Sequence, residues 1–200
     1  MRILLIANGE NSDTDVSEFD KIICIDGGLN YVDSNIVPDV IIGDFDSCDI
    51  NMIKKFKTSK IVYKNNQDVS DLKFSMQYCL NNYNPDEIVI SNAISSDRFD
   101  HSICNVLLLK EIPKNIDVKI ITKTQEVFIL RDKKEIKNLS GKTLSIIPLL
   151  DCKNVKTEGL KWNINGDLKF GYIDGISNII ISKTAKISVN KGELLIVIEK

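Results

Sequence analysis

The amino-terminal part of the sequence alternates short runs of β-branched apolar residues with stretches in which apolar residues recur at helical spacing. This alternation is typical of a parallel sheet whose strands are joined by crossover helices. Helical spacing predicts helices over residues 69–80 and 99–109. The β-branched runs predict strands over residues 2–7, 21–25, 39–42, 60–63, 87–90 and 117–122.

The pattern changes after about residue 125, where short strand-like segments alternate with glycine-containing intervals. Such punctuation, without a long helical pattern, predicts a small antiparallel β unit. We therefore expect two domains: an α/β domain with a mainly parallel sheet over residues 1–130, and an antiparallel β-sandwich or barrel-like domain over residues 131–200. The charged run RDKKEIKN at 131–138 is interpreted as either a linker or an exposed hairpin.

Composition excludes several classes of protein. With 43% hydrophobic and 27% charged residues, the 200-residue chain is neither disordered nor fibrous. Its 26 basic and 28 acidic residues form no basic stripe, which argues against a nucleic-acid partner. The sequence shows no signal peptide and no apolar run long enough to cross a membrane, so we expect a cytoplasmic chain without a membrane partner. Five scattered cysteines without a CxxC pair predict neither a zinc site nor a disulfide framework.

Two pairs of aspartates stand at predicted element boundaries. Asp44 and Asp46 belong to the block GDFDS at 43–47, which directly follows an apolar strand, and ligands of open parallel sheets bind at the carboxyl ends of strands. Asp68 and Asp71 lie where the helix over residues 69–80 should begin, which makes Asp68 a candidate N-cap and puts Asp71 in the first turn.

If these aspartates converge, a cation must hold them together, because two carboxylates about 4 Å apart repel by about 4 kcal/mol at an effective dielectric of about 20. Oxygen ligands suit Mg²⁺, which proteins hold through carboxylates and substrate phosphates. The competing interpretation is that these residues end a strand, cap a helix or face solvent. Spacing alone leaves both interpretations open.

A third polar cluster, SSDRFDHSICN at 95–105, also follows an apolar run. The planar fork of Arg98 suits a phosphate, and Asp100 is a candidate ligand of metal or substrate. His101, the single histidine of the chain, shares a helix face with Asn105. A ligand-binding and a structural role for His101 both stay open.

The block Asp26-Gly27-Gly28 is a further acidic turn at the end of an apolar strand. Paired glycines allow a main chain to approach a nucleotide closely. Taken alone, however, the block favours an ordinary turn.

Six blocks in this order resemble the thiamine pyrophosphokinase family, and the resemblance spans nearly the whole chain. The blocks are DGG at 26–28, PDVIIGDFDS at 38–47, DVSD at 68–71, RFDHSICN at 98–105, TEGLKWN at 157–163 and GISN at 175–178. The resemblance implies an ATP-binding α/β domain, a thiamine-binding β domain and a homodimer with active sites at the subunit interface. It also implies transfer of the terminal pyrophosphoryl group of ATP to the thiamine hydroxyl, which gives thiamine diphosphate and AMP with Mg²⁺.

The resemblance further implies roles for individual residues. Those that would hold Mg²⁺ and the phosphates or orient the thiamine hydroxyl are Asp44, Asp46, Asp68 and Asp71, with Asp71 favoured over Asp46 as the proton acceptor. Those that would line the ATP side, together with Asp68, are Asp26, Gly27, Gly28, Arg98, Asp100, His101 and Asn105. Ser177 and Asn178 would meet thiamine, and Trp162 would stack on it across the dimer interface in the family's arrangement. Without its motif, Trp162 would be interpreted as a core residue.

Some positions depart from the family pattern. Gln67 stands where a lysine is usual, Ser70 replaces a threonine, and Lys64 is a candidate compensating cation. Before Arg98, Ala93 replaces the glycine that opens the motif, and Ser96 and Asp97 replace a glycine pair, which puts a carboxylate where phosphates are expected. Two alternative functions therefore stay open: a metal-dependent DxD glycosyltransferase, and a catalytically degenerate protein that binds thiamine or a nucleotide.

Overall fold

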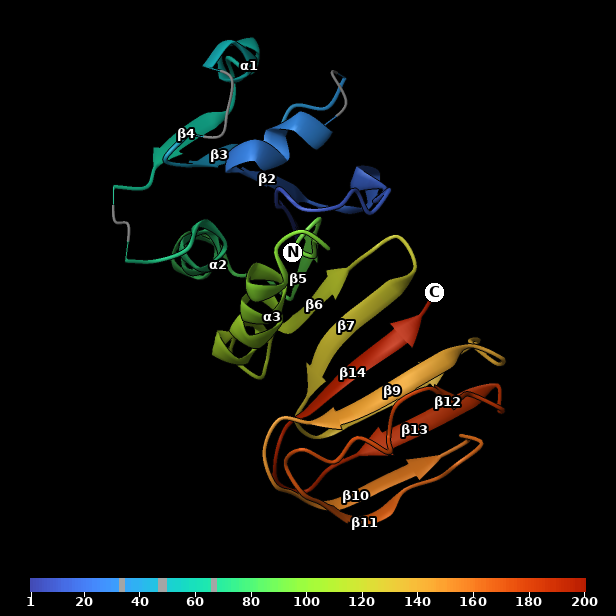
Figure 1. Cartoon of the computed structure of the whole chain (residues 1–200). Coiled ribbons are helices and arrows are strands. Elements are labelled where there is room, and N and C mark those ends of the chain that lie inside the picture. The colour runs from blue at the N-terminus through green and yellow to red at the C-terminus, as the bar shows by residue number, and fades with distance from the viewer. Residues whose placement is uncertain (33–34, 47–49, 66–67) are drawn as a thin grey trace. The chain divides into compact units, whose positions relative to one another are not determined.

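The computed structural model describes residues 1–32, 35–46, 50–65 and 68–200, shown in Figure 1. Ser47 of the GDFDS block and Gln67 lie outside the described residues. Contacts within the chain divide it into two compact units, Met1–Lys123 and Thr124–Lys200. Within the described residues, no helix is both long and apolar enough to span a membrane.

Unit 1 contains a parallel sheet in the order β6-β5-β1-β2-β3-β4. Its strands are β1 (Arg2–Ile6), β2 (Lys21–Ile25), β3 (Val40–Gly43), β4 (Lys60–Tyr63), β5 (Glu87–Ser91) and β6 (Asp117–Ile121). The chain passes from β1 through β4 on one side of β1 and returns to β5 on the other side. The strand order therefore reverses next to β1, and the carboxyl edge at such a reversal is where open α/β sheets bind ligands.

Both faces of this sheet are buried, as expected for parallel strands. Leu4 and Ile6 share a core cluster with Ile41 of β3, and the alternate residues Ile3 and Leu5 are completely buried as well. Burial on both faces explains why the central strands β1, β2, β3 and β5 appear in the sequence as nearly continuous apolar runs.

The helices of unit 1 are α1 (Ile50–Lys55), α2 (Asp71–Asn82) and α3 (Phe99–Leu108), with short 3₁₀ segments η1 (Val16–Glu18), η2 (Asp26–Tyr31) and η3 (Leu109–Glu111). Helix α2 packs against β2 and β3. The predicted N-cap Asp68 is wrong, because Ser70 caps α2: its Oγ accepts the Lys73 N–H at 3.3 Å. Asp71 lies in the first turn, as predicted.

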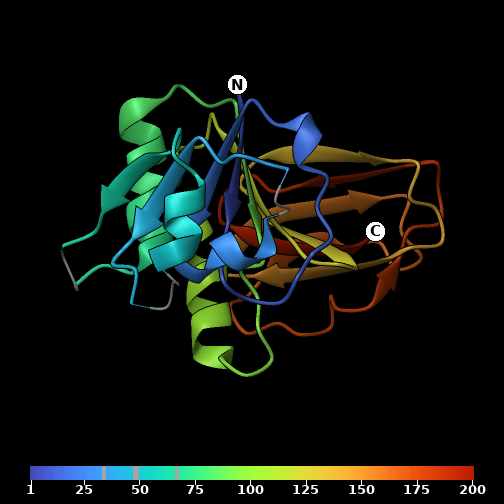
Figure 2. The same cartoon turned by 90° about the horizontal axis from the view of Figure 1, so that it is seen from above.

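Unit 2 consists of antiparallel strands in two groups, β12-β9-β14-β7 and β11-β10-β13-β8. They are β7 (Gln125–Leu130), β8 (Lys133–Lys137), β9 (Thr143–Pro148), β10 (Cys152–Glu158), β11 (Asn165–Leu168), β12 (Asn178–Ile179), β13 (Thr184–Ser188) and β14 (Leu194–Glu199), coloured yellow to red in Figure 2. One apolar cluster joins residues of both groups, including Ile146 of β9 and Ile187 of β13. The predicted fold class, a mainly parallel α/β region followed by an antiparallel β region, is confirmed.

Candidate active site

A cavity of about 480 Å³ opens at the carboxyl edge of the unit 1 sheet. Its described walls are the residues that directly follow strands β1 to β5 and the first turns of α2 and α3. The sequence blocks Asp26, Asp44–Asp46, Asp71 and Arg98–Asn105 thus supply side chains to one cavity. Adjacent parallel strands end at the same edge of a sheet, which brings together residues that are distant in sequence.

Three carboxylates form the most compact polar group in this cavity. Asp26 follows β2, and Asp44 and Asp46 follow the neighbouring strand β3. One oxygen from each lies within 4.8 Å of the others. Asp26 is only 8% exposed. Gly43 permits this approach, because a Cβ at Gly43 would lie 3.1 Å from the Cβ of Asp26.

This group is not the same as the set of four aspartates that the resemblance suggested as metal ligands. It contains Asp26, which sequence analysis placed on the ATP side. Asp71 lines the same cavity outside the group, and Asp68 is exposed and is not among the described residues of the cavity wall. The signal for Asp26 was present in the sequence, since it ends an apolar strand just as Asp44 does.

The backbone at the ends of these strands takes unusual conformations. Asp26 has φ 45°, Phe45 has φ 62° and Asn92, after β5, has φ 55°. The left-handed region is costly for residues with a Cβ, and such strain gathers at functional sites. The Phe45 ring packs edge-on against Tyr63, with centroids 5.1 Å apart, so the turn that carries Asp44 and Asp46 is anchored at the residue between them.

Asp71 faces a buried lysine across the cavity wall. Lys64, the residue after β4, is only 4% exposed, and its Nζ lies 2.9 Å from Asp71 Oδ1. Asp71 Oδ1 is itself buried and has no hydrogen-bond partner among the described residues. The contact with Lys64 is therefore an ion pair by distance but not an aligned hydrogen bond.

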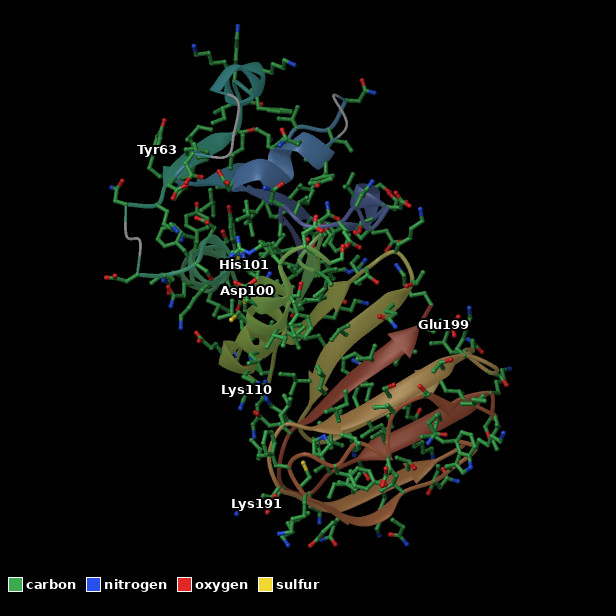
Figure 3. The ribbon with its side chains drawn as sticks, in the orientation of Figure 1. Tyr63, Asp100, His101, Lys110, Lys191 and Glu199 are labelled. Carbon is green, nitrogen blue, oxygen red and sulfur yellow. The ribbon has the colours of Figure 1, made fainter. Side chains whose placement is uncertain are left out.

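Arg98, Asp100 and His101 lie together at the start of α3, where Figure 3 shows Asp100 next to His101. Arg98 donates to both oxygens of Asp100, at 3.2 and 3.1 Å, and its Nη2 contacts His101 Nε2. The hydrogen bond from Arg98 is the main cause that lowers the pKa of Asp100 to about 2. Arg98 and His101 line the cavity, and Asp100 orients the guanidinium of Arg98.

Two polar side chains of α3 shape the loop before it. Ser102 Oγ accepts the Ser95 N–H at 2.9 Å, and Asn105 Nδ2 donates to the Ala93 carbonyl at 2.8 Å. Asn105, predicted to line the ATP side, does line the cavity while it braces this loop. Sequence analysis did not single out Ser102, although it shares the block of Arg98 and Asn105.

The paired glycines of η2 allow this segment to pack closely against the residues at the end of β1. A Cβ at Gly28 would lie 2.1 Å from the Ile6 carbonyl oxygen, and one at Gly27 would lie 2.3 Å from the Asn8 amide. The described cavity wall contains neither glycine. Their clearest contribution is to let Asp26 and η2 lie against the end of β1.

Sequence analysis also missed the segment after β1. Asn8 and Gly9 line the cavity, and the Gly9 N–H donates to the Asn92 carbonyl at 2.6 Å. A Cβ at Gly9 would meet the Ile94 carbonyl oxygen at 2.5 Å. The asparagine-glycine pair directly after an apolar strand was the available signal.

The predicted thiamine-side residues gather within unit 2. Trp162 is 56% exposed, so it is not a core residue of the β unit, and Lys161 Nζ lies 4.5 Å from its ring centroid. Asn178 is buried and forms two hydrogen bonds with the Trp162 backbone. Its Nδ2 donates to the Trp162 carbonyl at 2.6 Å, and its Oδ1 accepts the Trp162 N–H at 3.2 Å. Ser177, with φ 56°, is exposed beside it. Asn178 therefore fixes the backbone that carries the exposed indole.

We expect Asn178→Ala to increase the mobility of Trp162, because both hydrogen bonds to the Trp162 backbone are lost. Trp162 is the single tryptophan of the chain, so the steady-state anisotropy of protein fluorescence reports on it directly. The anisotropy should fall in Asn178→Ala and stay unchanged in the control Asn190→Ala, which alters an exposed asparagine of the same unit. An unchanged anisotropy in Asn178→Ala would show that Trp162 is held by other contacts.

Comparison with protein families gives two matches that together cover most of the chain. Residues 14–122 match the family model "Thiamin pyrophosphokinase, catalytic domain". Residues 129–194 match "Thiamin pyrophosphokinase, vitamin B1 binding domain". The first match contains all the cavity residues that follow β2 to β5, and the second contains Trp162, Ser177 and Asn178.

Individual relatives agree with these matches. The chain is 28% identical to thiamine pyrophosphokinase of Bacillus subtilis over 179 residues, which are 86% of this chain and 83% of the relative. The crystal structure of the B. subtilis protein superposes with a TM-score of 0.88 at 25% identity and covers 100% of this chain and 99% of that one. A thiamin pyrophosphokinase family protein from Enterococcus faecalis has the same fold, with a TM-score of 0.86 at 19% identity and coverage of 100% and 99%.

Proposed function

The chain belongs to the thiamin pyrophosphokinase family, and from this premise we propose that it transfers the pyrophosphoryl group of ATP to the hydroxyl of thiamine. The products are thiamine diphosphate and AMP. The observation that carries the proposal is the group of Asp26, Asp44 and Asp46 inside a cavity at the carboxyl edge of a parallel sheet. A polyphosphate nucleotide and its metal ion are the ligands that suit such a cavity.

The donor set suits Mg²⁺. Three carboxylates offer oxygen atoms within 4.8 Å of one another, and among the described residues the group includes neither histidine nor cysteine. In this proposal Asp26, Asp44 and Asp46 hold the ion, while Asp68 is assigned no contact. An ion held by these residues would supply positive charge to neutralise the phosphate oxygens.

Asp71 is the residue that we assign to the thiamine hydroxyl. Its side chain lines the cavity and is about one-third exposed, while Lys64 lies against the buried Oδ1, so the carboxylate is placed to accept a proton from a bound hydroxyl. The hydroxyl oxygen forms a bond to the β-phosphorus of ATP, and the bond from that phosphorus to the oxygen shared with the α-phosphate breaks. AMP leaves with that oxygen, and Asp71 takes the hydroxyl proton.

Arg98 and His101 are placed to bind the nucleotide from the α3 side of the cavity. Asp100 restrains the guanidinium of Arg98 through two hydrogen bonds. Less side-chain entropy is then lost when Arg98 binds a nucleotide. Asp97 of the same loop is exposed. Because its carboxylate repels phosphate, we expect Asp97 to weaken the binding of any nucleoside triphosphate.

Trp162 is proposed to bind the ring system of thiamine, whose thiazolium carries a fixed positive charge. An indole face stabilises such a cation by about 1–2 kcal/mol. Ser177 offers a hydroxyl to the aminopyrimidine, and Asn178 contributes by holding Trp162. The proposed assembly is a homodimer, in which a second copy would cover the exposed apolar residues Trp162, Ile173 and Ile176.

We expect Trp162→Ala to raise KM for thiamine about tenfold and to change KM for ATP much less, because the lost stacking energy concerns thiamine alone. Steady-state kinetics with each substrate varied in turn would measure both constants. Trp162→Phe, which keeps an aromatic face, should recover part of the affinity. Equal losses for thiamine and ATP would indicate a packing role for Trp162.

The activity itself is tested by incubating the protein with ATP, Mg²⁺ and thiamine and following thiamine diphosphate and AMP together. Equimolar formation of the two products supports pyrophosphoryl transfer, whereas ADP in place of AMP would contradict it. If neither forms, the other nucleoside triphosphates are tried in turn. Thiamine binding without turnover under all these conditions would instead support a catalytically degenerate binding protein.

A further inference from the structure

Lys64 is a buried, positively charged residue of the cavity wall to which the proposed mechanism assigns no role. It follows β4 at the carboxyl edge, where its N–H donates to the Gly43 carbonyl at 2.9 Å and extends the pairing of β3 with β4. Its side chain is 4% exposed, although it lines the cavity. Burying an ammonium group costs desolvation free energy unless other partners replace the lost water. The burial of Lys64 therefore needs a compensating interaction.

The partners of Lys64 within the described part of the chain use only part of its donor capacity. Nζ donates to the Val69 carbonyl at 2.9 Å and lies 2.9 Å from Asp71 Oδ1. The approach to Asp71 is not an aligned hydrogen bond, since Oδ1 has no hydrogen-bond partner in the part of the chain that the structure describes. An ammonium carries three donors. Within the described residues, Lys64 thus has donor capacity left over in the wall of this cavity.

The cavity also holds few other cations. Only two basic side chains line its described walls, those of Lys64 and Arg98, apart from the single histidine. The same walls include the four carboxylates of Asp26, Asp44, Asp46 and Asp71. Arg98 is exposed and is already bonded to both oxygens of Asp100. Lys64 is therefore the buried positive charge of the cavity, and it stands next to the residue assigned to the reacting hydroxyl.

We propose that Lys64 is a substrate-contacting residue, whose ammonium binds the oxygens of the pyrophosphoryl group that ATP donates. The inference rests on the proposed function and adds a residue to it. A compact ammonium suits phosphate oxygens as a point charge. In the same position it stays beside Asp71, so one lysine orients both the group that is transferred and the carboxylate that receives the proton.

The proposal predicts which part of the nucleotide Lys64 recognises. We expect Lys64→Met to raise the Kd of ATP at least tenfold and to change the Kd of AMP less than twofold, because AMP lacks the two phosphates that are transferred. Isothermal titration calorimetry with Mg²⁺ and without thiamine measures both constants, and no turnover occurs under these conditions. Lys64→Arg, which keeps the positive charge, should recover part of the ATP affinity.

A matched control separates substrate contact from a structural brace. Lys21 pairs with Asp39 at 2.6 Å on the opposite edge of the sheet, so Lys21→Met removes a comparable ion pair away from the cavity. Both methionine variants should lose some thermal stability, but only Lys64→Met should lose ATP affinity selectively. If Lys64→Met does not fold, Lys64→Gln keeps a donor for the Val69 carbonyl and serves instead.

Two results would overturn the proposal. Unchanged ATP affinity in Lys64→Met would reduce Lys64 to a brace, and equal losses for ATP and AMP would show that it does not recognise the transferred group. Either result, obtained while the wild-type protein binds ATP and forms thiamine diphosphate, leaves the proposed function intact. Failure of the wild-type protein to bind any nucleoside triphosphate would instead overturn the proposed function itself.

Discussion

Replacement of Asp71 by asparagine is expected to lower kcat by about 10³-fold while the protein remains folded, within the range of about 10²–10⁴ that a proton acceptor contributes. Asparagine preserves the shape of the side chain and one oxygen near Lys64, but it cannot take a proton from a hydroxyl. The N-cap of α2 is Ser70 and does not depend on Asp71, so the helix should form normally.

Steady-state kinetics and circular dichroism of Asp71→Asn would check both parts of this expectation. Asp39→Asn is a suitable control, because Asp39 is also about one-third exposed and pairs with a lysine, Lys21, at the amino end of β3. A similar loss of kcat in both variants would indicate that ion-pair loss alone lowers activity. A fully active Asp71→Asn enzyme would remove Asp71 from the mechanism.

The parallel sheet of unit 1 was predictable because its strands are buried on both faces. Continuous apolar runs such as 21–25 and 60–63 coincide with β2 and β4. The run 39–42 became β3 at Val40–Gly43, a shift of one residue. Such runs carry a strong signal because most of their residues are apolar and many are β-branched.

Two strands of unit 2, β8 and β10, were harder to predict than β9 and β14, in which buried and half-buried residues alternate regularly. In β8 only Ile136 is buried, and in β10 the sequence CKNVKTE buries Cys152, Val155 and Thr157 at irregular spacing. The register of β10 against β11 shifts between Cys152 and Val155. A bulged strand with mostly charged residues lacks the regular alternation by which strands are recognised.

The charged residues of the cavity were predictable one by one, but their grouping was not. A strand-end position identified Asp26, Asp44 and Asp46 as candidates, whereas joining Asp26 to the other two required the knowledge that β2 lies next to β3. Asp68 was chosen as the helix cap because aspartate and serine are both good caps. Ser70 stood two residues further on, and the backbone there selected it.

We expect Asp44→Asn to weaken Mg²⁺ binding about thirtyfold, which corresponds to about 2 kcal/mol. One of three carboxylates that share a space of 4.8 Å loses its charge, whereas an asparagine oxygen can still accept the Asp46 N–H, which lies 3.4 Å from Asp44 Oδ1. Titration calorimetry with Mg²⁺ alone would measure the affinity, and kcat at fixed ATP should need a correspondingly higher Mg²⁺ concentration.

The same substitution should raise thermal stability when no divalent cation is present, because it relieves repulsion among the three carboxylates. Each kcal/mol relieved corresponds to about 2–4 °C in Tm for a chain of this size. At saturating Mg²⁺ the wild type should instead have the higher Tm. A ligand that binds the folded state stabilises it more when it binds more tightly, and the wild type binds Mg²⁺ more tightly. Asp117→Asn, at the opposite edge of the sheet, should show neither effect. A Tm of Asp44→Asn below that of the wild type without metal would mean that the three carboxylates are held by hydrogen bonds strong enough to outweigh their repulsion, and a cation would then be unnecessary for bringing them together.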